Sequence, residues 1–142
     1  MNKYMEIADS EARKGINRKH GGPFGAVIVK NDKVISKSHN EVLKRNDCTC
    51  HAEMLAIREA SKKLKTWNLN GCELYTNCEP CPMCKAAINW AKIKIVYYGC
   101  NSEDLKEIGF DEKEGNNKGL EMKELNRDEC KSLLGEYKGT LY

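Results

Sequence analysis

The stretch CELYTNCEPCPMCKAAINWAKIKIVYYG (Cys72–Gly99) decides the fold of this 142-residue chain. Its beginning, CELYTN (Cys72–Asn77), predicts a short strand, and its end, IKIVYYG (Ile93–Gly99), predicts a buried strand. Between them PMCKAAINWA (Pro82–Ala91) predicts a helix with proline at its first position, where the missing N–H costs nothing. Strand, helix and strand in this order form a right-handed parallel crossover, which is the repeating unit of an α/β sheet.

The segments before this stretch supply a hairpin and a second helix. The run Gly25–Lys30, a turn at Asn31 and Asp32, and a return strand through Val34 and Ile35 predict the hairpin. The segment HAEMLAIREASKKL, residues 51–64, has apolar residues on one stripe and predicts the helix. The predicted helices can therefore cover the faces of the sheet that the strands form.

Two further helices are expected at the ends of the chain. At the C-terminal end Asn126 and Glu129 resemble a capping box. The N-terminal helix is expected to end before the glycines at positions 21 and 22. Its apolar face is expected to combine Tyr4, Ala8, Ala12 and Ile16. The resulting order of elements fits a three-layer α/β domain with a mixed sheet.

Composition places the chain among ordinary proteins of one domain. The hydrophobic fraction is 40% and the charged fraction is 32%. The first fifteen residues contain no apolar leader, and no stretch approaches the roughly eighteen apolar residues of a membrane span. We therefore expect a cytoplasmic protein without a membrane partner, whose clustered cysteines bind metal or do chemistry rather than form disulfides.

The charge pattern gives no sign of a polynucleotide partner. The net charge is +3, positive over residues 1–100 and negative over residues 101–142. A nucleic-acid binder concentrates its positive charge along one element. The basic runs KRND (44–47) and SKKLK (61–65) are short, so we interpret them as solvated faces of helices.

The cysteines of CEPCPMC and the histidine of HAE are candidate zinc ligands. Catalytic zinc sites take three ligands from protein and leave one position for water. Cys81 and Cys84 at the start of one helix can clamp an ion, and His51 at the start of another can complete the set. From the first turn of its helix Glu53 reaches the same place, so we expect it to handle the proton of the bound water. Such a site suits attack on an aminated ring carbon of a nucleobase.

Three other interpretations of these cysteines stay open. Cys81 and Cys84 could be buried core residues, although the proline spacing and the upstream H-x-E would then be coincidences. The spacing of Cys78, Cys81 and Cys84 also suits an iron–sulfur cluster, which wants a fourth cysteine and commonly a second copy, and neither is evident nearby. A purely structural zinc would leave Glu53 without a role.

The other cysteines and histidines are not expected to be ligands. Cys78 is expected to end its strand, and we expect no metal at His20 or His39. The cysteines without ligand spacing are expected in the core or on the surface: Cys48, Cys50, Cys72, Cys100 and Cys130.

HAE and PCPMC together fit H-x-E…P-C-x-x-C, the general signature of zinc-dependent nucleobase deaminases. From Met1 to about Glu112 the chain resembles the cytidine deaminase superfamily. The resemblance implies one domain over residues 1–142, an α/β fold, and a three-layer α/β/α sandwich around a central mixed five-stranded sheet. It also implies one Zn²⁺ with a bound water or hydroxide, held by the His51, Cys81 and Cys84 side chains, with Glu53 as the acid and base.

GGPFGAVIVK (21–30), INWA (88–91) and GFDE (109–112) look most like bacterial guanine deaminases, which turn the small molecule guanine into xanthine. The resemblance implies a second acid from the GFDE segment, Asp111 or Glu112. It implies a homodimer in which the tail, residues 113–142, crosses to the partner and Tyr142 closes the site. It further implies that Phe24 packs on the purine, Asn40 hydrogen-bonds it, the Ala52 amide meets its carbonyl and Trp90 walls the pocket.

Other functions stay open beside guanine deamination. HAEMLAIREA and EPCPMC also resemble tRNA adenosine-to-inosine deaminases, although those enzymes usually carry V-P-V-G-A where this chain has Gly22–Ala26. Such enzymes need a basic landing surface, whereas the tail is electrically neutral. Cytosine, another small aminated base or a nucleoside is a further alternative. A non-catalytic zinc module for binding partners is the alternative from another class.

Overall fold

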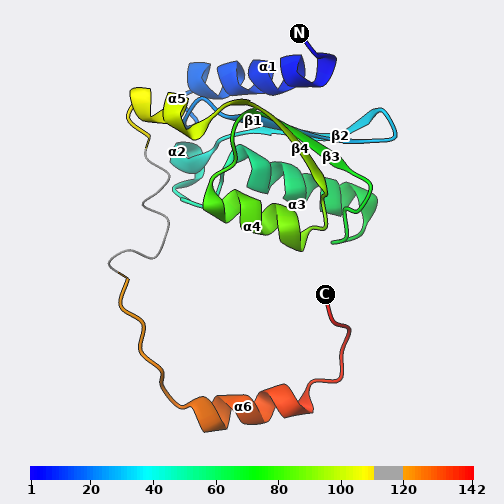
Figure 1. Ribbon diagram of the computed structural model, residues 1–142, viewed down its shortest axis with the longest axis vertical. Helices are drawn as coiled ribbons and strands as arrows, with labels where there is room; N and C mark the ends of the chain where they lie inside the picture. The colour runs from blue at the N-terminus through cyan, green and yellow to red at the C-terminus, as the bar shows by residue number, and fades with distance from the viewer. Residues whose placement is uncertain (111–119) are drawn as a thin grey trace.

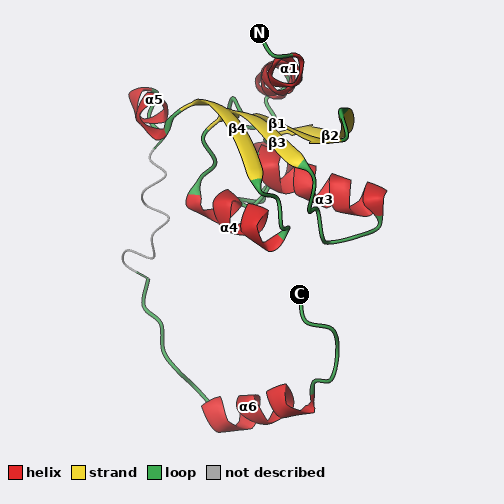
Figure 2. Cartoon of the chain, turned by 45° about the vertical axis from the view of Figure 1, so that its right-hand side comes forward, coloured by secondary structure: helices red, strands yellow, loops and turns green. Residues whose placement is uncertain are grey.

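A computed structural model of the protein describes residues 1–110 and 120–142. The elements are α1 (Lys3–Asn17), β1 (Gly25–Lys30), β2 (Lys33–His39), α2 (Val42–Arg45), α3 (Ala52–Leu64), β3 (Glu73–Cys78), α4 (Pro82–Trp90), β4 (Ile95–Cys100), α5 (Ser102–Glu107) and α6 (Arg127–Glu136). Helix α1 covers one face of the sheet and α3 and α4 cover the other (Figures 1 and 2). The expected α/β layering is thus present.

The sheet is mixed, in the order β2-β1-β3-β4. Strand β1 is antiparallel to both β2 and β3, while β3 and β4 are parallel and joined through α4, as the sequence predicts. The expectation of five strands is wrong, because the described residues form four. Directly after β4, Asn101 and Asp104 exchange side-chain hydrogen bonds with each other's backbone N–H, and this capping box starts helix α5 where a further strand could begin.

The hairpin forms as predicted, and its first strand lies in the centre of the sheet. Five of the six residues of β1 are buried, which fits a strand covered on both faces. Asn31 and Asp32 both adopt positive φ in the turn, a conformation that Asn and Asp tolerate well. A Cβ at Gly25 would lie 2.0 Å from the Ala8 carbonyl oxygen, so only glycine lets α1 pack this closely on β1.

Helix α1 confirms most of its predicted face. Tyr4, Ala8 and Ala12 are buried, but Ile16 is 44% exposed, so its placement on this face is wrong. An α-helix turns 100° per residue, so a spacing of four drifts by about 40° at each step and carries Ile16 off the face. Gly15 takes the buried position instead.

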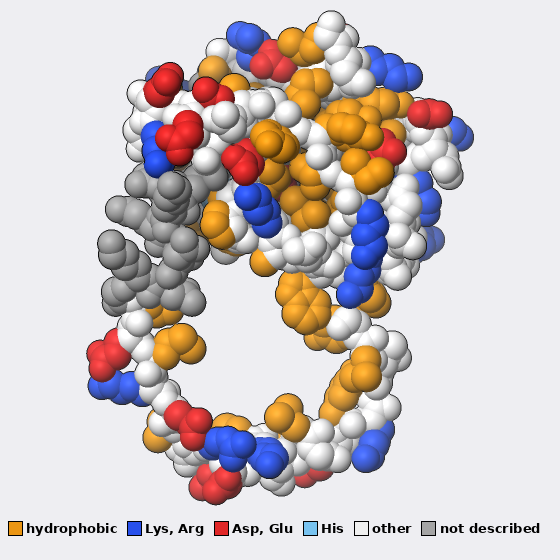
Figure 3. Space-filling view, in the orientation of Figure 1, with side chains coloured by type: hydrophobic (Ala, Val, Ile, Leu, Met, Phe, Trp, Pro, Cys, Tyr) orange, Lys and Arg blue, Asp and Glu red, His pale blue; other side chains and the backbone are white. Residues whose placement is uncertain are grey.

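Strand β4 and the C-terminal segment differ from expectation in their exposure. The sequence predicts β4 as a buried strand, but it lies at the sheet edge, and Ile95, Tyr97 and Tyr98 are exposed. Figure 3 shows hydrophobic side chains gathered on the face of the domain over this strand. Helix α6 is present as predicted, lies apart from the sheet and buries none of its residues (Figure 1). Its predicted capping box is wrong, because the Asn126 side chain makes no capping hydrogen bond.

No helix within the described residues is both long and apolar enough to cross a membrane.

Candidate active site

Two helix starts meet at one edge of the sheet and bring the predicted ligands together. His51 is the N-cap residue of α3, and Cys81 is the N-cap residue of α4, followed by Pro82 at the first helical position. The His51 Nδ1 atom lies 3.5 Å from the Cys81 Sγ and 3.6 Å from the Cys84 Sγ. One ligand atom from each of these three residues lies within 4.8 Å of the other two, so the group can hold a metal ion.

The distances and the donor types of this group fit zinc. Tetrahedral zinc has Zn–S bonds of about 2.3 Å and Zn–N bonds of about 2.0–2.1 Å, which separate a nitrogen and a sulfur ligand by about 3.5 Å. Both measured nitrogen–sulfur distances match this separation. Imidazole and thiolate ligands favour zinc over magnesium or calcium, which prefer oxygen.

The environment of Cys81 favours the thiolate, the form that binds metal, whereas that of Cys84 favours the thiol, which must lose its proton when an ion binds. Hydrogen bonds from the Cys84 side chain, from His51 and from a helix N–H lower the pKa of Cys81 to about 4. The neighbouring Cys81 sulfur and burial raise the pKa of Cys84. Cys81 is therefore a thiolate at neutral pH, and the partly positive N-terminus of α4 stabilises that charge.

Glu53 lies beside the ligand group and is almost fully buried. One carboxylate oxygen accepts from the Cys84 thiol at 3.5 Å, and the other lies 3.5 Å from the Thr76 hydroxyl. Burial raises the pKa of Glu53 above its ordinary value. A carboxylate with a raised pKa takes up a proton more readily at neutral pH, as a general base must.

A cavity of about 690 Å³ opens in front of these residues. His51, Glu53 and Cys81 line it, and so do Phe24 and Asn40, two of the five predicted substrate contacts. The Asn40 side-chain oxygen accepts from the Val42 N–H at 3.0 Å. The amide NH₂ of Asn40 is thus left to donate to a ring nitrogen or a carbonyl oxygen of a ligand.

Several residues of this cavity were not found by sequence reasoning. Phe110 packs edge-on against Phe24, with ring centroids 5.2 Å apart, and lines the same cavity. Its only signal in the sequence is an aromatic residue in the GFDE segment. Asn77 holds the loop that carries Phe24: its side chain accepts from the Gly25 N–H and donates to the Pro23 carbonyl, both at 2.8 Å.

A second carboxylate, Glu79, also lines the cavity without having been predicted. Its side chain accepts from Lys85 at 3.2 Å and from the Ser102 N–H at 3.0 Å. These hydrogen bonds, led by that from Lys85, lower the pKa of Glu79. Glu79 is therefore a weak base, in contrast to Glu53.

Among the described residues, the other predicted substrate contacts do not line this cavity. Trp90 ends α4, eight residues or about 12 Å along the helix from Pro82, so its predicted place in the pocket wall is not found in the single chain. Tyr142 is exposed, and its ring centroid lies 6.5 Å from that of Trp90. Ala52 is buried in the first turn of α3. Asp111 and Glu112 lie outside the described residues.

Comparison with known proteins agrees with this geometry. The family model for the cytidine and deoxycytidylate deaminase zinc-binding region matches residues 1–100. Guanine deaminase of Bacillus subtilis (strain 168) is 49% identical over 109 residues, which cover 77% of this chain and 70% of that protein. The tRNA-specific adenosine deaminase of Aquifex aeolicus (strain VF5) is 45% identical over 95 residues, which cover 67% of this chain but only 62% of that protein.

Solved structures of guanine deaminases are also similar to this chain. The crystal structure of guanine deaminase from Bacillus subtilis superposes with a TM-score of 0.88 at 36% identity, covering 100% of this chain and 99% of that chain. Guanine deaminase from Nitrosomonas europaea superposes with a TM-score of 0.73 at 34% identity, covering 77% of this chain and 63% of that chain. Since the family model spans the segments that carry the His–Cys–Cys group, the chain belongs to the cytidine and deoxycytidylate deaminase zinc-binding family.

Proposed function

We propose that this protein is a zinc-dependent guanine deaminase, which hydrolyses guanine to xanthine and ammonia and so serves purine breakdown or salvage. The observation that carries the choice of guanine is the extent of the structural match. The structure of Bacillus subtilis guanine deaminase superposes on 100% of the chain, tail included, with a TM-score of 0.88, whereas a solved structure of a tRNA:A34 deaminase superposes on 71% of it with a TM-score of 0.69.

In this proposal His51, Cys81 and Cys84 hold one zinc ion per chain. When bound, zinc supplies the Lewis acidity that makes water a nucleophile at neutral pH. Glu53 accepts a proton from the attacking water and passes it to the ring nitrogen beside the aminated carbon. The water oxygen bonds to that carbon, and Glu53 then moves the remaining proton of the added hydroxyl to the amino group. The carbon–nitrogen bond breaks as the carbonyl of xanthine forms, and the nitrogen leaves as ammonia. A second acid, Asp111 or Glu112, is proposed to assist this last transfer.

The cavity offers a flat base two kinds of contact. Phe24 and Phe110 present aromatic surface, which favours stacking and edge contacts with a planar ring. The Asn40 NH₂ group can donate to an acceptor on the edge of the base, and the backbone N–H of Ala52 is proposed to meet its carbonyl oxygen. Guanine has the acceptors that both contacts require.

We further propose a homodimer in which residues 113–142 exchange between subunits and bring Tyr142 to the partner's site. Two observations support this. The apolar residues of β4 are exposed in the single chain, and so are the leucines Leu133 and Leu134 of α6. Contiguous apolar surfaces of this kind mark association sites. We propose the cytoplasm as the compartment, because clustered thiols stay available to zinc where they are kept reduced.

The competing substrates are separated by one panel. Purified protein is offered guanine, cytosine, adenine, guanosine and a tRNA anticodon stem-loop, and ammonia release is measured. We expect release from guanine at a rate far above the others, because guanine is a free base with the acceptors that the Asn40 and Ala52 contacts require. Ammonia from the stem-loop alone would overturn the choice of guanine, and ammonia from none of them would favour a non-catalytic zinc module.

A further inference from the structure

A second group of side chains outside the deaminase site has the composition and geometry of a metal site. His20, His39 and Glu41 each offer a ligand atom, and these atoms lie within 4.8 Å of one another. We propose that these three residues form a second metal site, for a divalent transition ion such as Zn²⁺. The site is independent of the proposed deaminase activity, because it uses none of the His–Cys–Cys residues.

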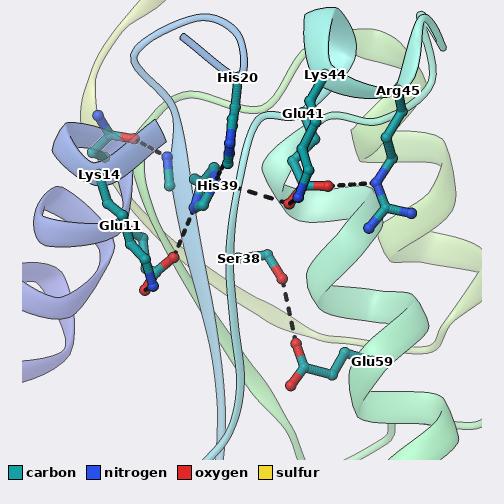
Figure 4. A network of polar contacts seen from close by, with 11 residues as sticks. Glu11, Lys14, His20, Ser38, His39, Glu41, Lys44, Arg45 and Glu59 are labelled. Carbon is teal, nitrogen blue, oxygen red and sulfur yellow. Dashed lines mark hydrogen bonds and ion pairs between the residues drawn. The ribbon is translucent and has the colours of Figure 1, made fainter. Parts of the chain in front are cut away.

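His39 is oriented as a metal-binding histidine usually is. Its side chain is buried, and its Nδ1 lies 2.9 Å from a carboxylate oxygen of the buried Glu11 (Figure 4). A carboxylate accepts only, so Nδ1 carries the proton and Nε2 presents its lone pair. A carboxylate behind the ring of a ligating histidine fixes its tautomer and its direction. The ring cannot turn away, because Gly15 of α1 packs against it so closely that a Cβ there would lie 2.8 Å from its Cδ2.

The other two ligand atoms lie in front of this lone pair. His20 Nδ1 is 2.8 Å and Glu41 Oε1 is 3.9 Å from His39 Nε2. Two such atoms on one tetrahedral zinc ion are about 3.3 Å apart, given bonds of about 2.0–2.2 Å, so the measured distances bracket the required one. His20 is only half-buried and can rotate to widen the first distance. An ion would then take the place of the proton on His20 Nδ1, and His20 would carry its proton on Nε2 instead.

The surroundings allow an ion to enter and set its strength of binding. The three residues line a cavity of about 580 Å³ that leaves room for water at the fourth position. The carboxylates of Glu11 and Glu41 balance the charge of a dication. Lys14, Lys44 and Arg45 contact these carboxylates, and these cations are 43–54% exposed, so water screens only part of their repulsion. Four further cations line the same cavity: Arg18, Lys37, Arg58 and Lys62. With nearby cations and no thiolate, this site is weaker than the His–Cys–Cys site.

The position of the ligands indicates what the ion does. His20 directly precedes Gly21, and His39 and Glu41 flank Asn40, and both Gly21 and Asn40 line the deaminase cavity. The two segments already touch, since a Cβ at Gly21 would lie 2.0 Å from the Asn40 side-chain oxygen. An ion bound by His20, His39 and Glu41 cross-links these segments and stabilises one wall of the cavity. Its role is structural.

The test counts ions in the zinc-loaded protein. Wild type and variants are equilibrated with excess buffered Zn²⁺, passed through a desalting column at a constant low free Zn²⁺ concentration and analysed for zinc per chain. We expect two ions in wild type and one in His20→Gln, whose half-exposed position makes it safe for the fold. Glu59→Gln is the matched control: Glu59 lines the same cavity but does not belong to the ligand group, so this variant keeps two ions.

Two further measurements separate a metal site from a network of hydrogen bonds. Lys44→Gln removes a cation 3.8 Å from Glu41 Oε1 and should tighten binding of the second ion several-fold, which no purely hydrogen-bonded role explains. With Co²⁺ as the probe, the first ion should show thiolate-to-metal charge transfer and the second should not. One ion per chain in wild type, a second ion that persists in His20→Gln, or thiolate absorption from both ions would overturn the proposal.

Discussion

Two carboxylates line the deaminase cavity, and replacing each by its amide should separate catalysis from structure. Glu53 and Glu79 both face the cavity, but burial raises the pKa of Glu53 while the Lys85 hydrogen bond lowers that of Glu79. When the environments of two carboxyl groups push their pKa values apart, the one with the raised pKa carries the proton. We predict that Glu53→Gln loses activity and that Glu79→Gln, the matched control, keeps most of it.

The size of the loss follows from the role of Glu53. A general acid or base contributes about 10²–10⁴-fold to the rate, equivalent to about 2.7–5.4 kcal/mol of activation free energy. Since one carboxylate serves several proton transfers here, we expect the upper part of this range. Stability should not fall, because Gln has the same shape and an uncharged side chain costs less to bury at a site that already disfavours the charged carboxylate.

The assay measures xanthine formation from guanine together with zinc per chain and the free energy of unfolding. The expected pattern for Glu53→Gln is low kcat with wild-type zinc content and stability, since the ligands at His51, Cys81 and Cys84 are intact. Full activity in Glu53→Gln would refute the assignment of the proton carrier. Equal losses in Glu53→Gln and Glu79→Gln would refute the distinction drawn from their surroundings.

Three further predictions test the cavity and the tail. Gly21→Ala displaces the Asn40 side chain, so KM for guanine should rise about tenfold, the equivalent of one lost hydrogen bond, with unchanged zinc content. Phe110→Ala removes one aromatic wall and should also raise KM, whereas Ile108→Ala, at an exposed position outside the cavity, should leave KM unchanged. Deletion of residues 120–142 should convert a dimer into a monomer in light-scattering measurements and lower activity. A dimer that survives this deletion would contradict tail exchange.

The ligand group could be predicted from the sequence because its geometry is local. Pro82 starts α4 and places Cys81 and Cys84 on the same first turn, so two of the three ligands are fixed by a span of four residues. His51 is at the corresponding place of α3, and the right-handed crossover brings both helix starts to one edge of the sheet. Only the pairing of two helices had to be inferred across the chain.

The walls of the cavity could not be predicted in this way, because they depend on contacts between distant segments. Phe110 reaches Phe24 only because the chain turns into α5 after β4 instead of adding a strand. Likewise His20 and His39 meet because α1 packs closely on the sheet at Gly15, and no spacing in the sequence records that approach. The residue pattern within one helix or strand does not indicate how closely it approaches a segment that is distant in the sequence.

The difference between the predicted burial of β4 and its exposure in the single chain can be explained by assembly with a partner subunit. IKIVYYG has the composition of a strand covered on both faces, yet Tyr97 and Tyr98 are exposed in the single chain. Helix α6 also leaves apolar side chains exposed, since Leu133 and Leu134 pack against no core. Fully burying one such side chain contributes about 1.5–3 kcal/mol, so leaving both surfaces in water would cost a large share of a domain's stability. A partner subunit that covers these surfaces would remove the cost, and the prediction of a buried strand would then hold for the assembly, though it fails for one chain.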